Sequence, residues 1–177
     1  MRIFIALLFE DEKKDIIYDI IQEIKFISKS GNFTDIKNLH LTIQYLGYTT
    51  PELLENIKEK LAEINLSKFN YETNRIKYFK KGNNKKIVYL GVEKNDLLTN
   101  LYNLVAIKLN ELDYRFSTTK YTPHISLGRG IALKEGELIS SIYCSSLTLS
   151  ANRISVMEST RVNGKIAYNE LFSVPLK

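Results

Sequence analysis

The 177-residue chain has one cysteine, and this scarcity excludes a whole class of structure. With Cys144 alone no intramolecular disulfide can form, which favours a reducing compartment, and we expect a cytoplasmic protein. Long apolar runs are lacking as well. No stretch approaches the ~20 residues that cross a bilayer, so we expect no membrane partner. The apolar run at residues 2–9 is short and ends in acids, which predicts a buried first strand rather than a signal peptide.

Histidines are also few, and their number restricts the chemistry available. The usual catalytic zinc site takes three protein ligands, and the chain offers two histidines, one cysteine distant from them and no convincing acidic partner, which disfavours such a site. Glycine-rich loops that cradle phosphates are absent, and no nucleophile elbow supports a serine triad. The sequence therefore predicts a site that holds no metal.

The remaining composition is typical of a globular chain, 44% hydrophobic with a mean hydropathy of −0.17. Its length fits a single domain over residues 1–177. The formal net charge of +5 and the isoelectric point near 9.1 favour a polyanionic partner such as RNA. A lysine-rich composition explains the same charge without such a partner, so the charge alone decides nothing.

The two histidines open the same short pattern, because His40 is followed two residues later by Thr42, and His124 by Ser126. On a β-strand, side chains two residues apart lie on one face, so each pattern predicts an imidazole beside a hydroxyl. An imidazole can transfer protons near neutral pH, and a hydroxyl can hydrogen-bond a phosphoryl oxygen. Two such pairs facing each other are predicted to perform acid–base chemistry across one phosphorus.

A single pattern of this kind is more typical of a hydrogen-bonded structural histidine. Its repetition favours function, because both copies lie on predicted strands and occupy the same place in an apparent internal repeat. The histidines are 84 residues apart (124 − 40), and the same offset aligns residues 3–6 with residues 87–90. Each half reads as strand, helix, strand. If an approximate two-fold axis relates the halves, both histidines face a common cleft.

The apolar spacing along the chain predicts alternating helices and strands. Helices are expected over residues 11–29, from Pro51 onward, over residues 95–112 and, as a short one, over residues 133–141. Strands are expected over residues 70–79, 87–92, 147–158 and 166–174. This order predicts an α+β class with a two-lobed, pseudo-two-fold duplicated fold, in which mainly antiparallel sheets line a central cleft and helices lie outside.

Longer motifs surround both histidines: NLHLTIQYLG over residues 38–47 and YTPHISLGR over residues 121–129. The runs RIFIA at residues 2–6 and VYLGV at residues 88–92, with the end of the chain from Glu158, complete the set. Together they resemble the two-histidine (2H) phosphoesterase superfamily, in particular the RNA 2′,3′-cyclic phosphodiesterases once described as 2′-5′ RNA ligases. The chain departs mildly from that pattern, with Ser126 where threonine is commoner.

The resemblance implies hydrolysis of the 2′,3′-cyclic phosphate at an RNA end, giving a 2′-phosphomonoester and a free 3′-hydroxyl without metal or cofactor. It implies that His40 is the proton donor and His124 the proton acceptor, although the near-symmetry of the motifs leaves these two roles open. Thr42, Ser126 and Arg129 would bind the phosphate. The partner is then an RNA with a 2′,3′-cyclic phosphate terminus, and we expect a monomer.

Other residues near the motifs have weaker support. Arg129 lies five residues past His124, so an ideal strand would point it to the opposite face, and its role requires a bend or bulge at Gly128. The alternative is an ordinary surface charge. Tyr121 is a candidate substrate contact, with half-buried packing as the alternative. The lysines at positions 80, 81, 85 and 86 either steer RNA or form a solvated hairpin turn.

Two rival functions stay open on the sequence alone. The same motifs fit hydrolysis of a 2′-5′ oligonucleotide or of a cyclic nucleotide-sugar phosphate. In a different class, the cleft would hold a phosphorylated RNA end without turnover. Reverse 2′-5′ ligation is allowed by microscopic reversibility, but water at high concentration favours hydrolysis.

Overall fold

The computed structural model describes residues 1–82, 84–112 and 121–177, and its strands carry both sequence motifs. The strands are β1 (Arg2–Leu8), β2 (Ser28–Phe33), β3 (His40–Tyr48), β4 (Phe69–Lys81), β5 (Lys85–Val92), β6 (His124–Leu133), β7 (Thr148–Ala151), β8 (Arg153–Val162) and β9 (Lys165–Pro175). The α-helices are α1 (Asp11–Phe26), α2 (Pro51–Ala62) and α3 (Asp96–Asn110), and two short 3-10 helices are η1 (Ile36–Asn38) and η2 (Ile139–Ser141).

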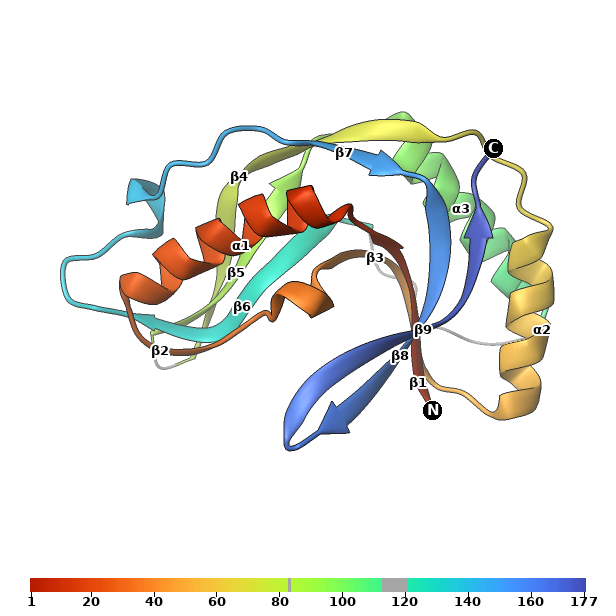
Figure 1. Ribbon diagram of the computed structural model, residues 1–177, viewed down its shortest axis with the longest axis horizontal. Coiled ribbons are helices and arrows are strands. Elements are labelled where there is room, and N and C mark those ends of the chain that lie inside the picture. The colour runs from red at the N-terminus through yellow and green to blue at the C-terminus, as the bar shows by residue number, and fades with distance from the viewer. Residues whose placement is uncertain (83, 113–120) are drawn as a thin grey trace.

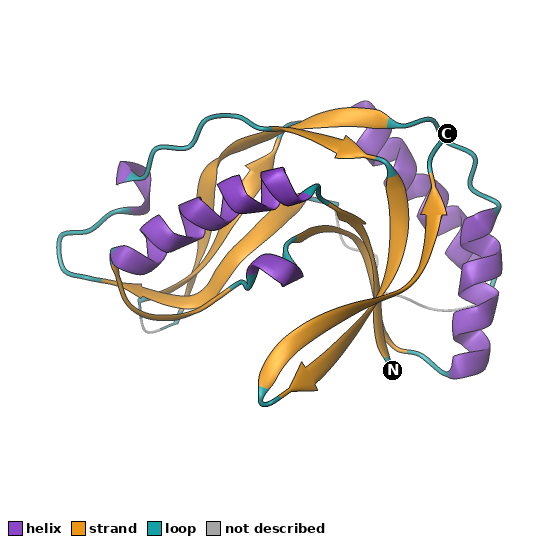
Figure 2. Cartoon of the chain, viewed as in Figure 1, coloured by secondary structure: helices purple, strands orange, loops and turns teal. Residues whose placement is uncertain are grey.

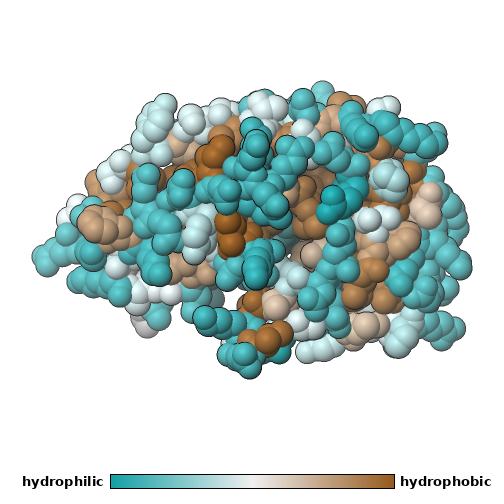
Figure 3. Space-filling view, viewed as in Figure 1, coloured by the Kyte–Doolittle hydropathy of each residue, from teal (hydrophilic) through white to brown (hydrophobic). Residues whose placement is uncertain are grey.

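The strands form two antiparallel sheets, with the orders β3-β1-β8-β9 and β2-β6-β5-β4-β7 (Figure 1). The chain passes directly from one sheet to the other, because β7 pairs with β4 while β8 pairs with β1. The predicted α+β class, with two lobes built from antiparallel sheets, is confirmed. Figure 3 shows the molecule hollowed between the tip of the β8–β9 hairpin and the lobe that carries β6.

The helices exchange sides between the two halves of the chain. Helix α1, from the first half, lies over the five-stranded sheet, whereas α3, from the second half, packs with α2 beside the four-stranded sheet (Figure 2). Side chains from both lobes therefore join one continuous apolar core. Fully burying one isoleucine contributes ~1.5–3 kcal/mol, and α1 alone buries Ile17, Ile20, Ile21 and Ile24.

Local sequence explains where the helices begin. The Thr50 hydroxyl accepts a hydrogen bond from the Leu53 amide (3.2 Å), and Pro51 takes the first helical position of α2, as its fixed backbone angle favours. Asn95 caps α3 in the same way, accepting from the Leu98 amide at 2.9 Å. These caps satisfy amide groups that have no partner within the helix.

The helix predicted over residues 11–29 is wrong at its end, because α1 stops at Phe26 and the next residues form β2. The Ser28 hydroxyl donates to the Ile24 carbonyl (2.6 Å) and so satisfies a helix-end acceptor. Strand β2 then pairs with β6, where Gly31 lies so close that an added Cβ would collide with Ile131. Pairing across the sheet overrides the helical periodicity here.

Two other predicted elements differ from the structure. The strand expected over residues 147–158 is divided into β7 and β8 at Asn152, whose carbonyl accepts from the Leu176 amide (2.9 Å) instead of continuing a ladder. The short helix expected over residues 133–141 is reduced to η2, because β6 extends to Leu133. Both differences arise from long-range backbone pairing that local periodicity does not report.

The internal repeat is present with a small correction. His40 pairs with Leu8, and His124 pairs with Gly91. The equivalent residues of β1 and β5 are therefore 83 apart (91 − 8), one fewer than the 84 that separates the histidines. The alignment of residues 3–6 with 87–90 is thus wrong by one position, because the segment between strand and histidine is one residue longer in the second half.

Candidate active site

The two histidines occupy equivalent positions at the start of β3 and β6. Along each strand the histidine and its hydroxyl partner, Thr42 or Ser126, are half-buried, while the residues between and after them are fully buried. Each histidine therefore shares a strand face with its hydroxyl, and the alternate side chains enter the core.

Both imidazoles are anchored by their own backbone. Nδ1 of His40 donates to the Asn38 carbonyl (2.7 Å), and Nδ1 of His124 donates to the Thr122 carbonyl (2.8 Å). A carbonyl only accepts, so in the neutral ring Nε2 is left as the acceptor. Nε2 of His40 lies 3.0 Å from the Thr42 hydroxyl. The Nε2 atoms are thus the ones available to move a proton.

Strand β6 bulges after its hydroxyl residue, as the sequence predicted around Gly128. The ladder to β5 skips Leu127. Leu127 and Gly128 are consequently both buried, the alternation slips by one residue, and Arg129 becomes exposed on the side of His124. Because of the bulge, Arg129 lies on the same side of the strand as His124, although a regular strand would place the fifth residue on the opposite side.

Strand β3 has the same bulge. Its ladder to β1 skips Ile43, and Ile43 and Gln44 are both buried. The fifth residue past His40, Tyr45, is then exposed, at 46% of its full accessible area. Tyr45 therefore occupies on β3 the position that Arg129 occupies on β6.

Charges from the second motif act on the first histidine. Burial lowers the pKa of His40, the hydrogen bond to the Asn38 carbonyl opposes this, and charge interactions with His124 and Arg129 lower it further. The structure thus brings these three groups from two strands to one site. At neutral pH His40 is uncharged in the free protein.

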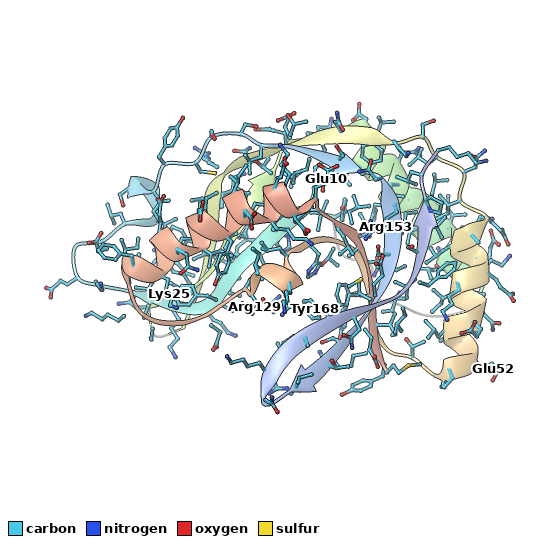
Figure 4. The ribbon with its side chains drawn as sticks, in the orientation of Figure 1. Glu10, Lys25, Glu52, Arg129, Arg153 and Tyr168 are labelled. Carbon is cyan, nitrogen blue, oxygen red and sulfur yellow. The ribbon has the colours of Figure 1, made fainter. Side chains whose placement is uncertain are left out.

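Aromatic rings enclose both imidazoles. The ring centroids of Phe4 and Tyr168 lie 4.9 Å and 5.2 Å from that of His40. On the other side, Tyr89 lies 5.3 Å from His124. Figure 4 shows Tyr168 beside Arg129, and the charge of Arg129 opposes the rise that burial produces in the Tyr168 pKa. These contacts restrict the rings and exclude water from one side of each.

Asn38 joins the β8–β9 hairpin to the first histidine, a role that the sequence did not reveal. Its side-chain amide donates to the Ile166 carbonyl (2.9 Å), and its side-chain oxygen accepts from the Tyr168 amide (3.2 Å). Because its own carbonyl accepts from His40, one residue fixes the hairpin and the imidazole together. The position of Asn38 two residues before His40 was the only hint in the sequence of a role at the site. Its partners could not be predicted, because they lie 128 and 130 residues further along the chain.

The structure places Tyr121 in packing. Its ring stacks on Tyr102 (centroids 4.3 Å apart, planes 8° apart), and its hydroxyl is buried. The lysines at 80, 81, 85 and 86 lie at the solvent-facing end of the β4–β5 hairpin, where Nζ of Lys86 is 5.4 Å from the Tyr78 ring centroid. Neither the tyrosine nor this lysine cluster enters the site proposed below.

The described residues hold neither a metal-binding cluster nor a membrane-spanning helix. Within residues 1–82, 84–112 and 121–177, no group of three or more histidine, cysteine, aspartate or glutamate side chains is placed to hold a metal ion. The helices in the same residues include none with the length and apolar character that crossing a membrane requires.

Comparisons with known proteins point to one family. A family model described as the 2′-5′ RNA ligase superfamily matches residues 14–163. A protein of Archaeoglobus fulgidus named RNA 2′,3′-cyclic phosphodiesterase is 29% identical over 129 residues, covering 73% of this chain and 72% of the relative. A protein of Thermotoga maritima with the same name is 27% identical over 164 residues, covering 90% and 87%.

Solved structures show the same fold. Escherichia coli LigT, solved in complex with 3′-AMP, superposes with a TM-score of 0.81 at 19% identity, over 99% of this chain and 97% of that chain. A Thermus thermophilus protein superposes with a TM-score of 0.79 at 18% identity, over 99% and 98%. At these identities the likeness concerns the architecture of the chain.

Proposed function

We propose that this chain, which belongs to the 2′-5′ RNA ligase superfamily of two-histidine phosphoesterases, hydrolyses 2′,3′-cyclic phosphate ends of RNA. The carrying observation is the matched pair of histidines, each tied through Nδ1 to a backbone carbonyl and each beside a hydroxyl on its strand. The names of the two relatives support the same substrate. The product is a 2′-phosphomonoester with a free 3′-hydroxyl.

In the proposed reaction, water attacks the phosphorus while the bond to the 3′ oxygen breaks. Nε2 of His124 accepts the proton that the water loses, and Nε2 of His40 donates a proton to the departing 3′ oxygen. The two imidazoles end with exchanged protonation states and re-equilibrate with solvent. Both transfers use Nε2 because each Nδ1 hydrogen is already held by a carbonyl.

Three side chains bind the phosphate in this proposal. The hydroxyls of Thr42 and Ser126 donate to the non-bridging oxygens, one from each strand. The Arg129 guanidinium offsets the negative charge that develops in the transition state. Among the described residues no carboxylate forms an ion pair with Arg129, so its charge is available to substrate.

The lowered pKa of His40 fits a proton donor only when substrate is bound. In the free protein the burial of the ring, and after it the charge interactions with His124 and Arg129, favour the neutral imidazole of His40. A phosphate between the motifs adds negative charge beside the ring, which favours the protonated form. Substrate binding therefore loads His40 with the proton that it later donates.

The test uses a short RNA ending in a 2′,3′-cyclic phosphate, in the presence of a chelator. Wild type should give a 2′-phosphate end, and His40→Ala or His124→Ala should each lose ~100-fold to 10,000-fold in rate. Arg161→Gln, at an exposed position near the end of β8, is the matched control and should retain full activity. Near-wild-type turnover by either histidine variant would overturn the proposed mechanism.

Two other outcomes would select the rival functions. If wild type leaves the RNA end intact, the same variants are assayed on 2′-5′ oligonucleotides and on cyclic nucleotide-sugar phosphates. Tight binding of the RNA end without turnover, unchanged in both histidine variants, would identify a binding module instead of an enzyme.

A further inference from the structure

On β3 the position equivalent to Arg129 is held by an uncharged residue, but the folded chain places a positive charge beside it. Tyr45 occupies it, and its hydroxyl accepts two hydrogen bonds from Arg2, one from Nε (3.1 Å) and one from Nη2 (2.9 Å). These paired bonds hold the guanidinium at the end of the tyrosine side chain. Two residues from β1 and β3 thus supply on one strand what a single arginine supplies on the other.

Aromatic rings also support the Arg2 guanidinium. Its central carbon lies 6.0 Å from the centroid of the Tyr45 ring and 5.8 Å from that of the Tyr48 ring. Cations near ring faces at such distances are stabilised by the π electrons. The guanidinium therefore lies beside both rings, which makes these tyrosines poor platforms for stacking a base.

The charge of Arg2 is not neutralised by the protein. The groups that raise its pKa are the tyrosines Tyr45, Tyr48 and Tyr168, and no carboxylate of the described residues pairs with it. The charges of both Arg2 and Arg129 act on Tyr168, which contacts His40. Both arginines are therefore near enough to Tyr168, which lines the site, for their charges to act on it.

We propose that Arg2 and Tyr45 form a second phosphate-binding subsite, which takes a phosphodiester on the 5′ side of the terminal nucleotide of the RNA. This inference rests on the proposed function, because the reacting cyclic phosphate occupies the histidine pair and Arg129. A guanidinium that is held in place and has no carboxylate partner suits phosphate oxygens, which can accept from the Nη1 and Nη2 hydrogens that Tyr45 leaves open. The subsite makes the protein prefer an RNA end over a free cyclic mononucleotide.

The experiment compares two substrates that differ in this phosphate. Adenosine 2′,3′-cyclic phosphate has only its cyclic phosphate, whereas a triadenylate with the same cyclic end also has two internal phosphodiesters. Arg2→Gln should lower the ratio of kcat/KM for the triadenylate to kcat/KM for the mononucleotide by about 10-fold, as expected for a lost charge-assisted hydrogen bond. Tyr45→Phe, which keeps the ring and removes the acceptor, should lower the ratio less, and Arg161→Gln should leave it unchanged.

Each result bears on the subsite or on the function separately. Equal losses on both substrates, or no loss on either, would overturn the subsite while leaving the proposed function intact. Failure of wild type on both substrates would overturn the proposed function and the subsite with it. If Arg2→Gln does not fold, as judged by its thermal unfolding, Tyr45→Phe decides the question through the same ratio.

Discussion

Strands β3 and β6 hold their histidines with the same backbone geometry but in different surroundings. β3 is the edge strand of its sheet, whereas β6 has a neighbour on each side. His40 lies against Phe4 and Tyr168, while His124 lies against Tyr89. The bulges match, yet the fifth residue after each histidine is Tyr45 in one strand and Arg129 in the other.

The two halves of the site are nearly symmetric in backbone geometry and unequal in their side chains. Nothing in the two short motifs separates a proton donor from a proton acceptor. Their surroundings differ, however, because burial, together with His124 and Arg129 of the opposite motif, lowers the pKa of His40. The difference between the two histidines therefore lies in residues far from them in sequence.

The largest expected effect comes from removing either histidine and following the pH dependence. Wild type should show a bell-shaped profile of kcat/KM. His40→Ala should lose the alkaline limb, which reports the donor, and His124→Ala should lose the acid limb, with the ~100-fold or greater loss in rate expected for each. Because the pKa of His40 is lowered, one limb of the wild-type profile should lie below the ordinary histidine value of about 6.5. Exchanged limbs would reverse the two roles.

Replacement of Arg129 should have the next largest effect. Arg129→Gln removes the cation expected to stabilise the transition state, and kcat should fall about 100-fold with a smaller change in KM. The measurement is steady-state kinetics on an RNA with a cyclic phosphate end. A change confined to KM would assign Arg129 to ground-state binding and remove it from catalysis.

Removal of the Asn38 side chain should have a moderate effect. Asn38→Ala loses two hydrogen bonds to β9 and keeps the carbonyl that anchors His40. The free energy of unfolding should fall by about 2 kcal/mol, and activity should fall because Tyr168 is no longer held against the imidazole. Urea unfolding checks the first effect. Asn103→Ala, on an exposed face of α3, is the control.

The smallest expected effect is on stability at low pH. The folded-state pKa of His40 is lowered, so the unfolded chain binds a proton more readily. The corresponding stability is present above pH about 6.5 and is lost as the pH falls toward the folded-state pKa. Urea unfolding at pH 7.5 and pH 5 should therefore show a larger drop for wild type than for His40→Gln. Equal drops would show that His40 makes no such contribution.

The sequence predicts what is local in this structure. Strand alternation correctly placed His40 beside Thr42, and the glycine before Arg129 correctly indicated the bulge. In contrast, the first two residues of β2 were predicted as helix, because the apolar spacing runs up to Ile27, but Ser28 and Lys29 belong to a strand that pairs with β6. Secondary-structure patterns report backbone preference, and a sheet edge can override that preference.

Long-range contacts explain what the sequence could not predict at the site. Arg2 reaches Tyr45 across 43 residues, and Asn38 reaches β9 across 128 and 130. Such pairs leave no periodicity and no motif in the chain. They become visible only when the strands are in register, and they supply most of the difference between the two halves of the site.

The exchange of helices between lobes has a consequence for the origin of the chain. A single strand-helix-strand copy would leave uncovered the apolar face that the helix of the other copy shields. Such a copy would need a second, identical chain to bury that face, and the resulting dimer would present two equal histidine motifs. When both copies lie in one chain, each motif can be substituted without the other. The two strands of this protein differ in that way, with Arg129 on β6 and Tyr45, bound to Arg2, on β3.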